Sequence, residues 1–480
     1  MEIPRQSPFQ TLVVDLDGTL IRGDLLREGV CRYLLRKPWS LPAVLTHAIR
    51  GPLFLKQYLA ERVEIGVEDL AYRQEVLELI EKSKSGGARV VLASASHESW
   101  VRRVARHLGC FDSVLGSLEV NLKGEAKLEA IRRLNPGVFA YIGNSDDDLP
   151  IWMASGFAYA VNPDAGIRKD LEASKPGAWA EVGRKSNLVR VWMKTLRVHQ
   201  WAKNVLILVP VIAAHQVFGT SEMRGAALCF IAFSAVASSV YLMNDLVDLR
   251  SDRRHPSKQS RPVASGEIPL DLAFLASGGL AVSGLALSSR VSPALTGVLA
   301  IYFLLNVVYS LFLKSVPMLD VVILSGMYTL RIIAGGRSTT TEVSQWLLVF
   351  STFFFMGLAL VKRYVEALLL DAGPGDVNRF GRGYRLEDAP ILLGFGMGSS
   401  LVSVLVFALY LDSPAVMSLY GRPDRLWSLV PLMMFWVGRL WLLAGRKKIP
   451  DDPVVFALRD PVSWGVGFVG LILLKWSVNA

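Results

Sequence analysis

The chain has 480 residues, of which 52% are hydrophobic and 20% are charged, and its formal net charge is +10. This length exceeds one ordinary soluble core, so two domains are expected. A positive charge of this size suits either nucleic acid or an anionic membrane face. Long apolar runs dominate residues 205–478 and the basic residues lie between these runs, which excludes a nucleic-acid partner and indicates a membrane protein.

Cysteine usage and the first residues indicate where the first half of the chain works. Cys31, Cys110 and Cys229 are odd in number and lack the spacing of metal ligands. They fit a reducing, cytosol-facing domain together with one buried apolar cysteine. Residues 1–10 are polar and run directly into a strand, so no signal peptide is expected.

The first half of the chain alternates short apolar runs with helical patterns. Strands are expected at 11–15, 89–94 and 138–143, with helices at 98–108 and 125–134. Strand, helix and strand in this order predict a parallel sheet with helices on both faces.

Two segments depart from this alternation and set the domain limits. Residues from about 24 to 85 are helical and are interpreted as an inserted cap. The polar residues 162–187, which contain Gly and Pro, are interpreted as a linker. The first domain is therefore expected at 1–185 and the second at 186–480.

From Trp201 onward the sequence contains nine apolar runs, each close to the ~20 residues needed to cross a bilayer. They lie at about 203–219, 225–243, 270–288, 293–312, 317–334, 345–361, 391–411, 426–444 and 461–478. Gly and Ser dilute the third and fifth runs, which leaves broken or interfacial helices open there. The second domain is thus expected to be all-α, with about nine transmembrane helices.

Basic residues cluster in alternate loops between these runs. The loops after the second, sixth and eighth runs hold Arg250, Arg253, Arg254, Lys258, Arg261, Lys362, Arg363, Arg379, Arg382, Arg385, Arg446, Lys447 and Lys448. The positive-inside rule then places the N-terminus and these loops in the cytoplasm and the C-terminus outside. We therefore expect a multi-pass protein of the inner (plasma) membrane with a cytoplasmic first domain.

An acidic pair follows the first predicted strand, in residues 15–19, Asp-Leu-Asp-Gly-Thr. Two carboxylates one residue apart suit phosphoryl transfer, because Asp15 can attack phosphorus while Asp17 protonates the leaving group and later activates water. Gly18 permits a tight turn beside the phosphate. Alone, the pair is also compatible with a simple turn at a strand end.

Three further features strengthen the phosphatase interpretation. Ser94 ends the second strand, where its hydroxyl can bond a phosphoryl oxygen. Lys127 can neutralise the phosphate and the aspartate, with Lys123 as the alternative lysine. Residues 143–148, Gly-Asn-Ser-Asp-Asp-Asp, follow the third strand with a cluster that suits Mg²⁺.

In order and spacing these motifs resemble those of the haloacid dehalogenase superfamily, over about residues 10–165. The resemblance implies an α/β Rossmann-like phosphatase domain with a small helical cap. It implies that Asp15 is the nucleophile, that Asp17 is the acid/base, and that Ser94 and Lys127 bind phosphate. The implied Mg²⁺ positions are Asp15, Asp17, Asn144 and Asp148. The family usually has Asp where this chain has Asn144, so metal affinity should be lower.

A second acidic cluster ends the second apolar run. Asp245, Asp248 and Asp252 are spaced by three and four, so they share one face of a helix. Three carboxylates at a bilayer boundary are costly unless a cation neutralises them. Mg²⁺ ions carrying a diphosphate suit this place, because Mg²⁺ prefers a few carboxylates together with substrate phosphates. A solvated loop of mixed charge would not explain the Asn244-Asp245 start inside an apolar run.

The cluster resembles the first Asp-rich motif of the UbiA superfamily, and the resemblance covers about residues 195–478. Ordinary members transfer a prenyl group from a prenyl diphosphate to an aromatic acceptor and usually carry a second DxxxD motif. The corresponding region here ends in a single Asp320 joined by Lys314, and position 324 is Leu. This departure puts prenyl transfer in doubt.

The pattern resembles instead the polyprenyl-phosphate phosphoribosyltransferase branch, whose donor is phosphoribosyl pyrophosphate and whose acceptor is a lipid phosphate. The matching stretches include 197–204 and 258–262. The resemblance implies that Asp245 and Asp248 are catalytic and that Asp252 joins them as a Mg²⁺ ligand. The implied substrate-binding residues are Lys203, Asn244, Lys258, Arg261, Tyr309, Lys314, Asp320, Arg331, Lys362, Arg363 and Glu366. For Lys362 and Arg363 singly, the positive-inside rule is an equal explanation.

These patterns predict a bifunctional, Mg²⁺-dependent membrane enzyme. It would transfer 5-phosphoribose from phosphoribosyl pyrophosphate to a polyprenyl phosphate and then remove the 5-phosphate. The first alternative is an aromatic prenyltransferase with a phosphatase of other specificity. The second is a non-catalytic scaffold or transporter, which the intact charge clusters on the membrane face disfavour. Prenyl chain length, the final sugar and a homo-oligomeric state are left open.

Overall fold

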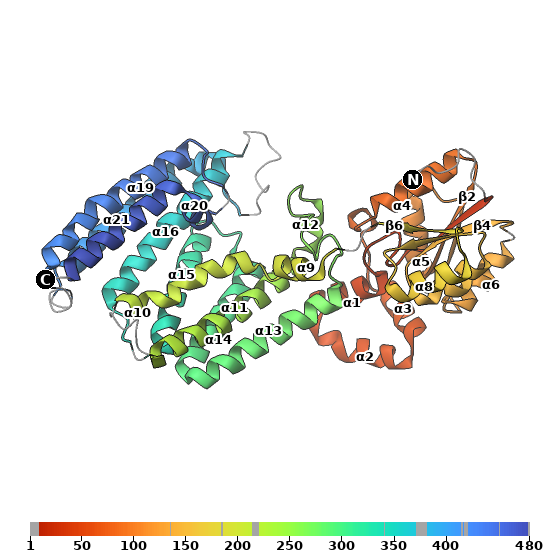
Figure 1. The fold of residues 1–480 in the computed structure, drawn as a ribbon, viewed down its shortest axis with the longest axis horizontal. Helices are drawn as coiled ribbons and strands as arrows, with labels where there is room; N and C mark the ends of the chain where they lie inside the picture. The colour runs from red at the N-terminus through yellow and green to blue at the C-terminus, as the bar shows by residue number, and fades with distance from the viewer. Residues whose placement is uncertain are drawn as a thin grey trace. The chain divides into compact units, whose positions relative to one another are not determined.

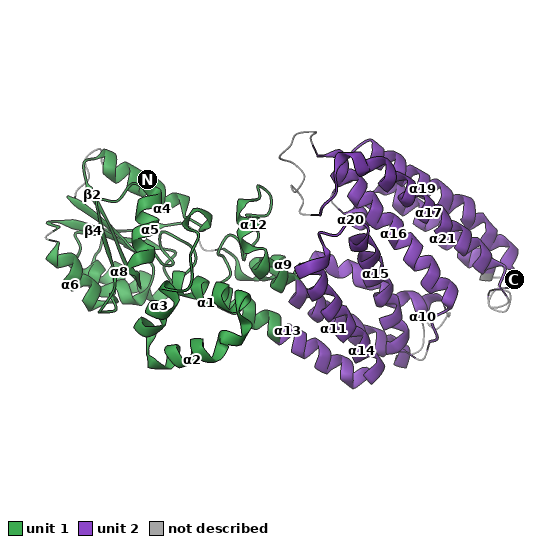
Figure 2. Ribbon diagram, turned by 180° about the vertical axis from the view of Figure 1, so that it is seen from behind, with its two compact units in different colours: residues 1–198, 241–278 green, residues 199–240, 279–480 purple. Residues whose placement is uncertain are grey.

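The computed structural model describes residues 9–134, 136–183, 186–213, 220–339, 341–370, 382–413, 416, 421–450 and 452–478. They form two compact units (Figure 2). Unit 1 comprises residues 1–198 and 241–278, and unit 2 comprises residues 199–240 and 279–480.

Unit 1 is built on a parallel sheet of six strands in the order β3-β2-β1-β4-β5-β6 (Figure 1). The strands are β1 (Thr11–Val14), β2 (Arg89–His97), β3 (Ser113–Ser117), β4 (Phe139–Gly143), β5 (Phe157–Val161) and β6 (Trp179–Val182). The three strands expected from the sequence are β1, β2 and β4, which lie side by side, with β1 paired to both others. The predicted parallel sheet is confirmed.

Helices cover both faces of this sheet, so both faces are buried. Successive residues of each strand point to opposite faces and therefore enter two different cores. Leu12 and Val14 face a core that includes residues of α4 (Gln74–Ser85) and α5 (Glu98–Leu108). Val13 faces the other core, which is shared by α6 (Glu125–Arg133), α7 (Leu149–Ala154) and α8 (Ala165–Ser174). The sheet therefore holds the ends of its central strands rigidly, and the acidic motifs follow these ends.

The segment between β1 and β2, expected as a cap from about 24 to 85, is helical. It contains α1 (Leu25–Arg36), α2 (Leu41–Arg50), α3 (Pro52–Ala60) and α4. Val76, Leu79 and Ile80 place α4 in the core against the sheet, so this last helix belongs to the sheet layer. The helical character is confirmed, whereas a separate small cap with these limits is not.

The expected linker at 162–187 is corrected by the structure. Within it, α8 covers the sheet through Ile167 and Leu171, and β6 pairs in parallel with β5. Of the glycines that suggested a linker, Gly166 lies within α8, whereas Gly177 and Gly183 lie outside the helix and strands and have positive φ. The segment reads as polar because α8 buries only one face and β6 lies at the sheet edge.

Among the described residues, seven helices are long and apolar enough to cross a membrane, and a bent pair brings the number to at most eight. These helices are α11 (Thr220–Val247), α13 (Leu270–Val291), α14 (Pro293–Val308) continued by a π-helical turn η5 (Tyr309–Leu313), α15 (Leu319–Ser338), α16 (Gln345–Leu368), α17 (Ala389–Leu411) and α19 (Leu429–Gly445). The predicted count of nine is not confirmed.

The difference from nine arises at the two ends of the apolar half. The first predicted run coincides with the short η4 (Val198–Leu208) and α10 (Val209–Ala213), and residues 214–219 lie outside the described residues. The last run is α21 (Pro461–Val478), which meets α20 (Pro453–Arg459) at 77°. Pro461 explains that break, because proline disfavours helical backbone in the preceding residue. The third and fifth runs form the continuous helices α13 and α15.

Candidate active sites

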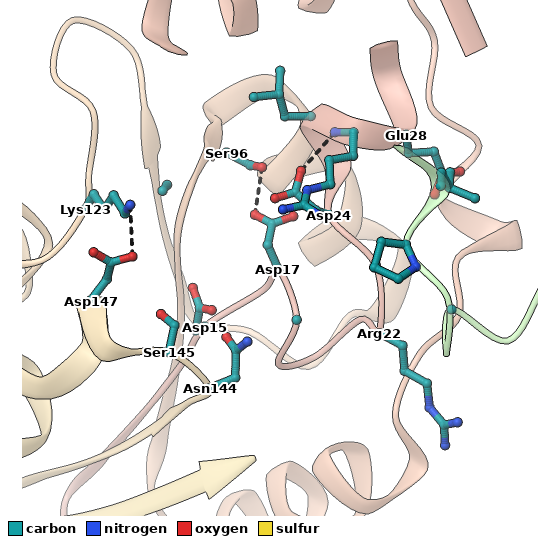
Figure 3. Close-up of a pocket in the computed structure, with 18 of the residues that line it drawn as sticks. Asp15, Asp17, Arg22, Asp24, Glu28, Ser96, Lys123, Asn144, Ser145 and Asp147 are labelled. Atoms are coloured by element: carbon teal, nitrogen blue, oxygen red, sulfur yellow. Dashed lines mark hydrogen bonds and ion pairs between the residues drawn. The ribbon is translucent and has the colours of Figure 1, made fainter. Parts of the chain in front are cut away.

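The acidic pair of the first motif lies in a cavity of about 560 Å³ in unit 1. Figure 3 shows Asp15, Asp17, Asn144 and Ser145 gathered there from the loops that follow β1 and β4. Loops at the carboxyl ends of parallel strands are where open α/β sheets bind ligands. The structure therefore brings the acidic pair and the motif of residues 143–148 together in one cavity.

Asp15 is buried and held by two donors. Lys127 donates to its Oδ1 at 2.8 Å, and the Thr19 hydroxyl donates to its Oδ2 at 3.1 Å. Burial raises the pKa of Asp15 to about 7, although the neighbouring Lys127 charge acts in the opposite direction. A fixed carboxylate beside a buried ammonium is a suitable nucleophile for phosphorus, because the cation also neutralises the incoming phosphate.

The structure distinguishes the two candidate lysines. Lys127 of α6 is 5% exposed and also donates to the Tyr141 hydroxyl at 3.1 Å. Lys123 is more than half exposed and pairs with Asp147 at 2.9 Å. Among these contacts only Lys127 touches Asp15, which favours it over Lys123.

Asp17 points away from Asp15, toward the start of α1 and the end of β2. Its Oδ1 accepts the Leu25 N–H at 2.8 Å, and its Oδ2 accepts from Ser94 at 2.9 Å and Ser96 at 2.7 Å. Burial raises the pKa of Asp17 to about 6, with Asp24 adding to the rise. A carboxyl with a pKa close to neutrality suits a group that gives and then takes a proton.

Ser96 is a residue that the sequence reasoning missed. Ser94 is fully buried and its hydroxyl is committed to Asp17 and to the Ser96 N–H, whereas Ser96 lines the cavity. The phosphate-binding role of Ser94 stays a prediction, and Ser96 is the better-placed hydroxyl. The only sequence signal was the Ser-Ala-Ser repeat of residues 94–96, whose period of two places both side chains on one side of the strand.

Replacement of Ser96 by alanine should move the pH profile of the phosphatase. The Ser96 hydrogen bond stabilises ionised Asp17 and so lowers its pKa, which means that Ser96→Ala should raise this pKa further. Since Asp17 must be protonated to act as an acid, the alkaline limb of kcat should shift upward by about 0.5–1 pH unit. A pH–rate profile measures this, and a downward shift would contradict the assigned role of Asp17.

The loop after β4 is shaped around Asp148 and Asn144. Asp148 is buried and accepts from the N–H groups of Asn144 and Ser145 and from the Tyr141 hydroxyl at 2.6 Å. Its oxygens are thus already engaged by protein donors, and Lys127 lies 3.5 Å away. The contacts give Asp148 a positioning role, and its predicted contact with Mg²⁺ stays a prediction.

Oxygen atoms suitable for Mg²⁺ do converge beside Asp15. Thr19 Oγ1 lies 3.1 Å from Asp15 Oδ2 and 3.0 Å from Asn144 Oδ1, so a carboxylate and an amide oxygen flank one point. Gly18 has φ +74°, and a Cβ there would approach Asn144 Nδ2 to within 2.4 Å, so glycine is needed for this approach. Mg²⁺ takes one or two carboxylates with other oxygens, so Asp15 and Asn144 fit it.

The Asp-rich motif spans the end of α11 and the short α12 (Leu249–Arg254) of unit 1. Hydrogen bonds from Asp248 N–H to Asn244 and from Asp252 N–H to Asp248 keep the helical spacing across the break. Arg261 contacts both Asp245 (3.3 Å) and Asp252, so these two carboxylates converge on one guanidinium. This agrees with the predicted shared face.

Arg197 is a second cation on this motif that the sequence reasoning did not name as a site residue. Its guanidinium donates to Asp245 and lies 4.9 Å from the centre of the Tyr241 ring. The residue has φ +51°, a conformation that is rare outside glycine and that clusters at functional sites. The signal in the sequence was its place in the 197–204 stretch.

The motif also carries an orphaned polar atom that fits a cation. Among the described residues, Asn244 Oδ1 is buried without a hydrogen-bond partner. Lys258 lies 3.9 Å from Asp252. No closed cluster of three His, Cys, Asp or Glu side chains occurs in the described part of the chain, so a Mg²⁺ ion here would complete its shell with amide oxygens, water or substrate phosphates.

Unit 2 gathers several predicted substrate-binding residues into one buried ion network. Asp320 is fully buried, accepts from Arg363 at 2.6 Å and accepts from the Tyr384 hydroxyl at 2.6 Å. Arg363 also contacts Glu366 at 2.5 Å, and Lys362 lies 4.0 Å from Glu366. Asp320, near the start of α15, therefore connects this helix to Arg363 of α16 and to Tyr384, which precedes α17.

The remaining predicted cations and Tyr309 are placed as follows. Arg331 is buried in α15, donates to Asn204, the Met327 carbonyl and the Tyr302 hydroxyl, and lies against three aromatic rings. Lys203 pairs with Asp452, and Tyr309 accepts from Arg382. Lys314 follows the π-helical turn that begins at Tyr309. Their substrate-binding roles stay predictions.

Comparison with known families matches both halves of the chain. The UbiA prenyltransferase family matches residues 205–459, more than half of the chain. The chain belongs to the UbiA prenyltransferase family. A haloacid dehalogenase-like hydrolase family matches residues 12–152, so this UbiA protein carries a hydrolase domain of that class before its membrane part.

Three relatives place this fusion among known proteins. The uncharacterized protein y4nM of Sinorhizobium fredii is 36% identical over 458 residues, 95% of this chain and 89% of that protein. Decaprenyl-phosphate phosphoribosyltransferase of Mycobacterium tuberculosis is 34% identical over 303 residues, 61% of this chain and 93% of that protein. A probable phosphatase of the same organism is 35% identical over 114 residues, 20% of this chain and 39% of that protein. The UbiA protein is thus a multi-pass membrane enzyme with a transferase part and a hydrolase part.

Proposed function

We propose that this UbiA protein transfers 5-phosphoribose from phosphoribosyl pyrophosphate to a polyprenyl phosphate and then removes the 5-phosphate. The UbiA domain performs the transfer, and the hydrolase domain performs the dephosphorylation with Mg²⁺. Both sites work at the cytoplasmic face of the inner membrane, with residues between β1 and β2 acting as the cap of the phosphatase. The finding that carries the proposal is that both carboxylate oxygens of Asp320 already accept hydrogen bonds from protein groups.

Asp320 is the sole carboxylate left where prenyl-transferring relatives have a second DxxxD. Both of its oxygens are taken by Arg363 and Tyr384, so it is already neutralised by protein groups. A site with one acidic motif and many cations suits a donor that carries both a diphosphate and a further phosphate. The same cations suit an acceptor that is itself anionic. The relative that carries the name decaprenyl-phosphate phosphoribosyltransferase supports the same choice of donor and acceptor.

In the transfer, the C1–O bond of the donor breaks, pyrophosphate leaves, and an oxygen of the lipid phosphate forms the new bond to C1. Mg²⁺ bound at the Asp-rich motif would stabilise the charge of the leaving pyrophosphate. Arg197 and Arg261 hold Asp245 in place, and Arg261 also holds Asp252. These arginines therefore set the positions of the two carboxylates before substrate binds.

In the dephosphorylation, a carboxylate oxygen of Asp15 attacks phosphorus and the 5-oxygen leaves with a proton from Asp17. Water then attacks the aspartyl phosphate while Asp17 accepts its proton, which releases inorganic phosphate and restores both residues. Lys127 neutralises the transferred group beside Asp15, and Ser94 and Ser96 keep Asp17 directed at the leaving oxygen. Mg²⁺ at Asp15 and Asn144 would screen the phosphate charge.

Donor choice tests the proposal. Membranes that contain the protein, incubated with ribose-labelled phosphoribosyl pyrophosphate and polyprenyl phosphate, should move label into the lipid phase. The same membranes should leave 4-hydroxybenzoate unmodified when a prenyl diphosphate is offered. Prenylation of 4-hydroxybenzoate without ribose transfer would overturn the proposal in favour of aromatic prenyl transfer.

A further inference from the structure

Two buried carboxylates of the hydrolase domain have their counterions far away in the sequence. Glu28 of α1 and Asp69 lie between β1 and β2, and their side chains are 2% and 1% exposed. Besides Arg32, which pairs with Glu28 from within α1, their arginine partners lie 181–225 residues later, in the segment 249–270 that directly follows the Asp-rich motif. Buried carboxylates are stable only when paired, so the arginines of 249–270 stabilise the segment between β1 and β2 that carries Glu28 and Asp69.

The Asp69 contact is the more extensive of the two. Arg250 Nε donates to Asp69 at 2.6 Å, and Arg254 donates through two of its nitrogens. Glu68 adds a contact of 2.9 Å to Arg250. Two guanidinium groups thus enclose one carboxylate, which fixes the orientation of α12 relative to the segment between β1 and β2.

The Glu28 contact ties the same segment to the cavity. Arg253 donates to both oxygens of Glu28, at 2.9 and 3.1 Å, and to the Ala264 carbonyl at 3.1 Å. Glu28 and Arg253 both line the phosphatase cavity. Figure 3 shows Glu28 beside the green ribbon of this later segment.

The backbone of the segment also approaches the catalytic turn closely. Gly266 has φ +74°, and a Cβ there would lie 2.8 Å from Arg22 Cβ and 3.5 Å from the Gly23 nitrogen. The Gly23 carbonyl in turn accepts the N–H of Gly18, next to Asp17. The segment therefore packs directly on the loop that carries the two catalytic aspartates.

One wall of the phosphatase cavity comes from this segment and is apolar except for Arg253. The lining residues it supplies are Arg253, Val263, Gly266, Ile268, Pro269 and Leu270. Leu270 is the first residue of α13, which is long and apolar enough to cross a membrane. A phosphate ester that reaches Asp15 along this wall thus passes the start of a membrane helix.

Resting on the proposed function, we propose that residues 249–270 act as a substrate-selecting wall that restricts the phosphatase to phosphate monoesters anchored in lipid. The apolar wall contacts the lipid side of the substrate, and the arginine contacts with Glu28 and Asp69 hold the wall in place. The segment that follows the transferase motif thereby also determines which phosphate ester the hydrolase domain accepts. Arg250 and Arg254 are positioning residues in this arrangement, because neither lines the cavity.

The test compares a lipid with a soluble substrate in the full-length protein. Arg250→Ala and Arg254→Ala together remove the contacts that hold residues 249–270 in place. Asp69→Asn is added in the same chain, because Asp69 would otherwise be a buried, unpaired carboxylate that destabilises the domain. We expect kcat/KM for ribose 5-phosphate to stay within about twofold of wild type, since Asp15 and Asp17 are untouched. For the phosphoribosylated polyprenyl phosphate in vesicles, kcat/KM should fall about 10-fold or more.

Arg32→Ala is the matched control. Arg32 also pairs with Glu28, at 2.7 Å, but from within α1, so its loss removes a cation from Glu28 without releasing the wall. This control should keep the wild-type preference for lipid. Equal losses on both substrates in the triple variant, or an unchanged preference, would overturn the inference.

Vesicles of phosphatidic acid separate this inference from the proposed function. A wild-type protein that hydrolyses phosphatidic acid faster than ribose 5-phosphate but ignores the phosphoribosylated lipid would refute the proposed substrate and support the wall. A wild-type protein that prefers ribose 5-phosphate over both lipids would refute the wall. Hydrogen exchange in 249–270 should also become faster in the triple variant and remain slow in Arg32→Ala.

Discussion

Asp15→Asn should leave lipid phosphoribosylation unchanged and make the 5-phosphorylated lipid accumulate. Asparagine keeps the shape of the side chain but has no charged oxygen to attack phosphorus, so phosphatase turnover should fall by at least about 10³-fold. The transferase carboxylates lie at the end of α11 and in α12 and keep their arginine contacts in this variant. Thin-layer separation of the labelled lipids measures the result.

Treatment with an external phosphatase is the control for this experiment. It should convert the lipid that accumulates in Asp15→Asn into the lipid that wild type makes directly, with release of inorganic phosphate. If mutant and wild type give the same lipid before treatment, the hydrolase domain acts on some other substrate. The two halves would then share a chain without sharing a pathway.

The phosphatase site was largely predictable because its residues follow the ends of regular strands. Asp15 and Asn144 each come directly after a buried apolar strand, and β1 and β4 are neighbours in the sheet. Parallel strands bring their carboxyl ends to one edge, so the sequence alone brings these motifs together. Lys127 lies within α6 and was named for its charge and its motif, and only its burial against Asp15 separates it from Lys123.

Contacts between distant segments could not be predicted in this way. The pairing of Asp69 with Arg250 and Arg254 joins residues more than 180 positions apart, and each residue alone looks like an ordinary surface charge. The arginines had a sufficient explanation in the positive-inside rule. Only the burial of the carboxylate shows that these charges serve packing as well.

Edge elements and helix ends were the other weak points of the sequence analysis. β6 has one neighbouring strand and few apolar residues, so 162–187 resembled a linker until its pairing with β5 was seen. Hydropathy likewise counted 203–219 as a span, whereas η4 and α10 are short. Periodicity is most informative where an element is long and buried on a defined face.

Asp248→Ala should abolish transfer of ribose to lipid, by at least about 100-fold, and leave hydrolysis of ribose 5-phosphate intact. Asp248 is the member of the Asp-rich motif chosen for replacement. Asp245 and Asp252 hold Arg197 and Arg261, so their replacement would also leave two half-buried cations without these partners.

Asp271→Ala is the matched control, because it also removes one carboxylate from unit 1. Asp271 lies at the start of α13 and pairs with Arg27 at the surface, where both side chains are about half exposed. A surface ion pair of this kind contributes little, about 0–1 kcal/mol, so this control should transfer ribose at close to the wild-type rate. Both activities are measured on the same membranes, one by label in lipid and one by released phosphate. Wild-type transfer by Asp248→Ala would show that the acidic motif does not hold the Mg²⁺-pyrophosphate, and the proposed transferase site would then have to be abandoned.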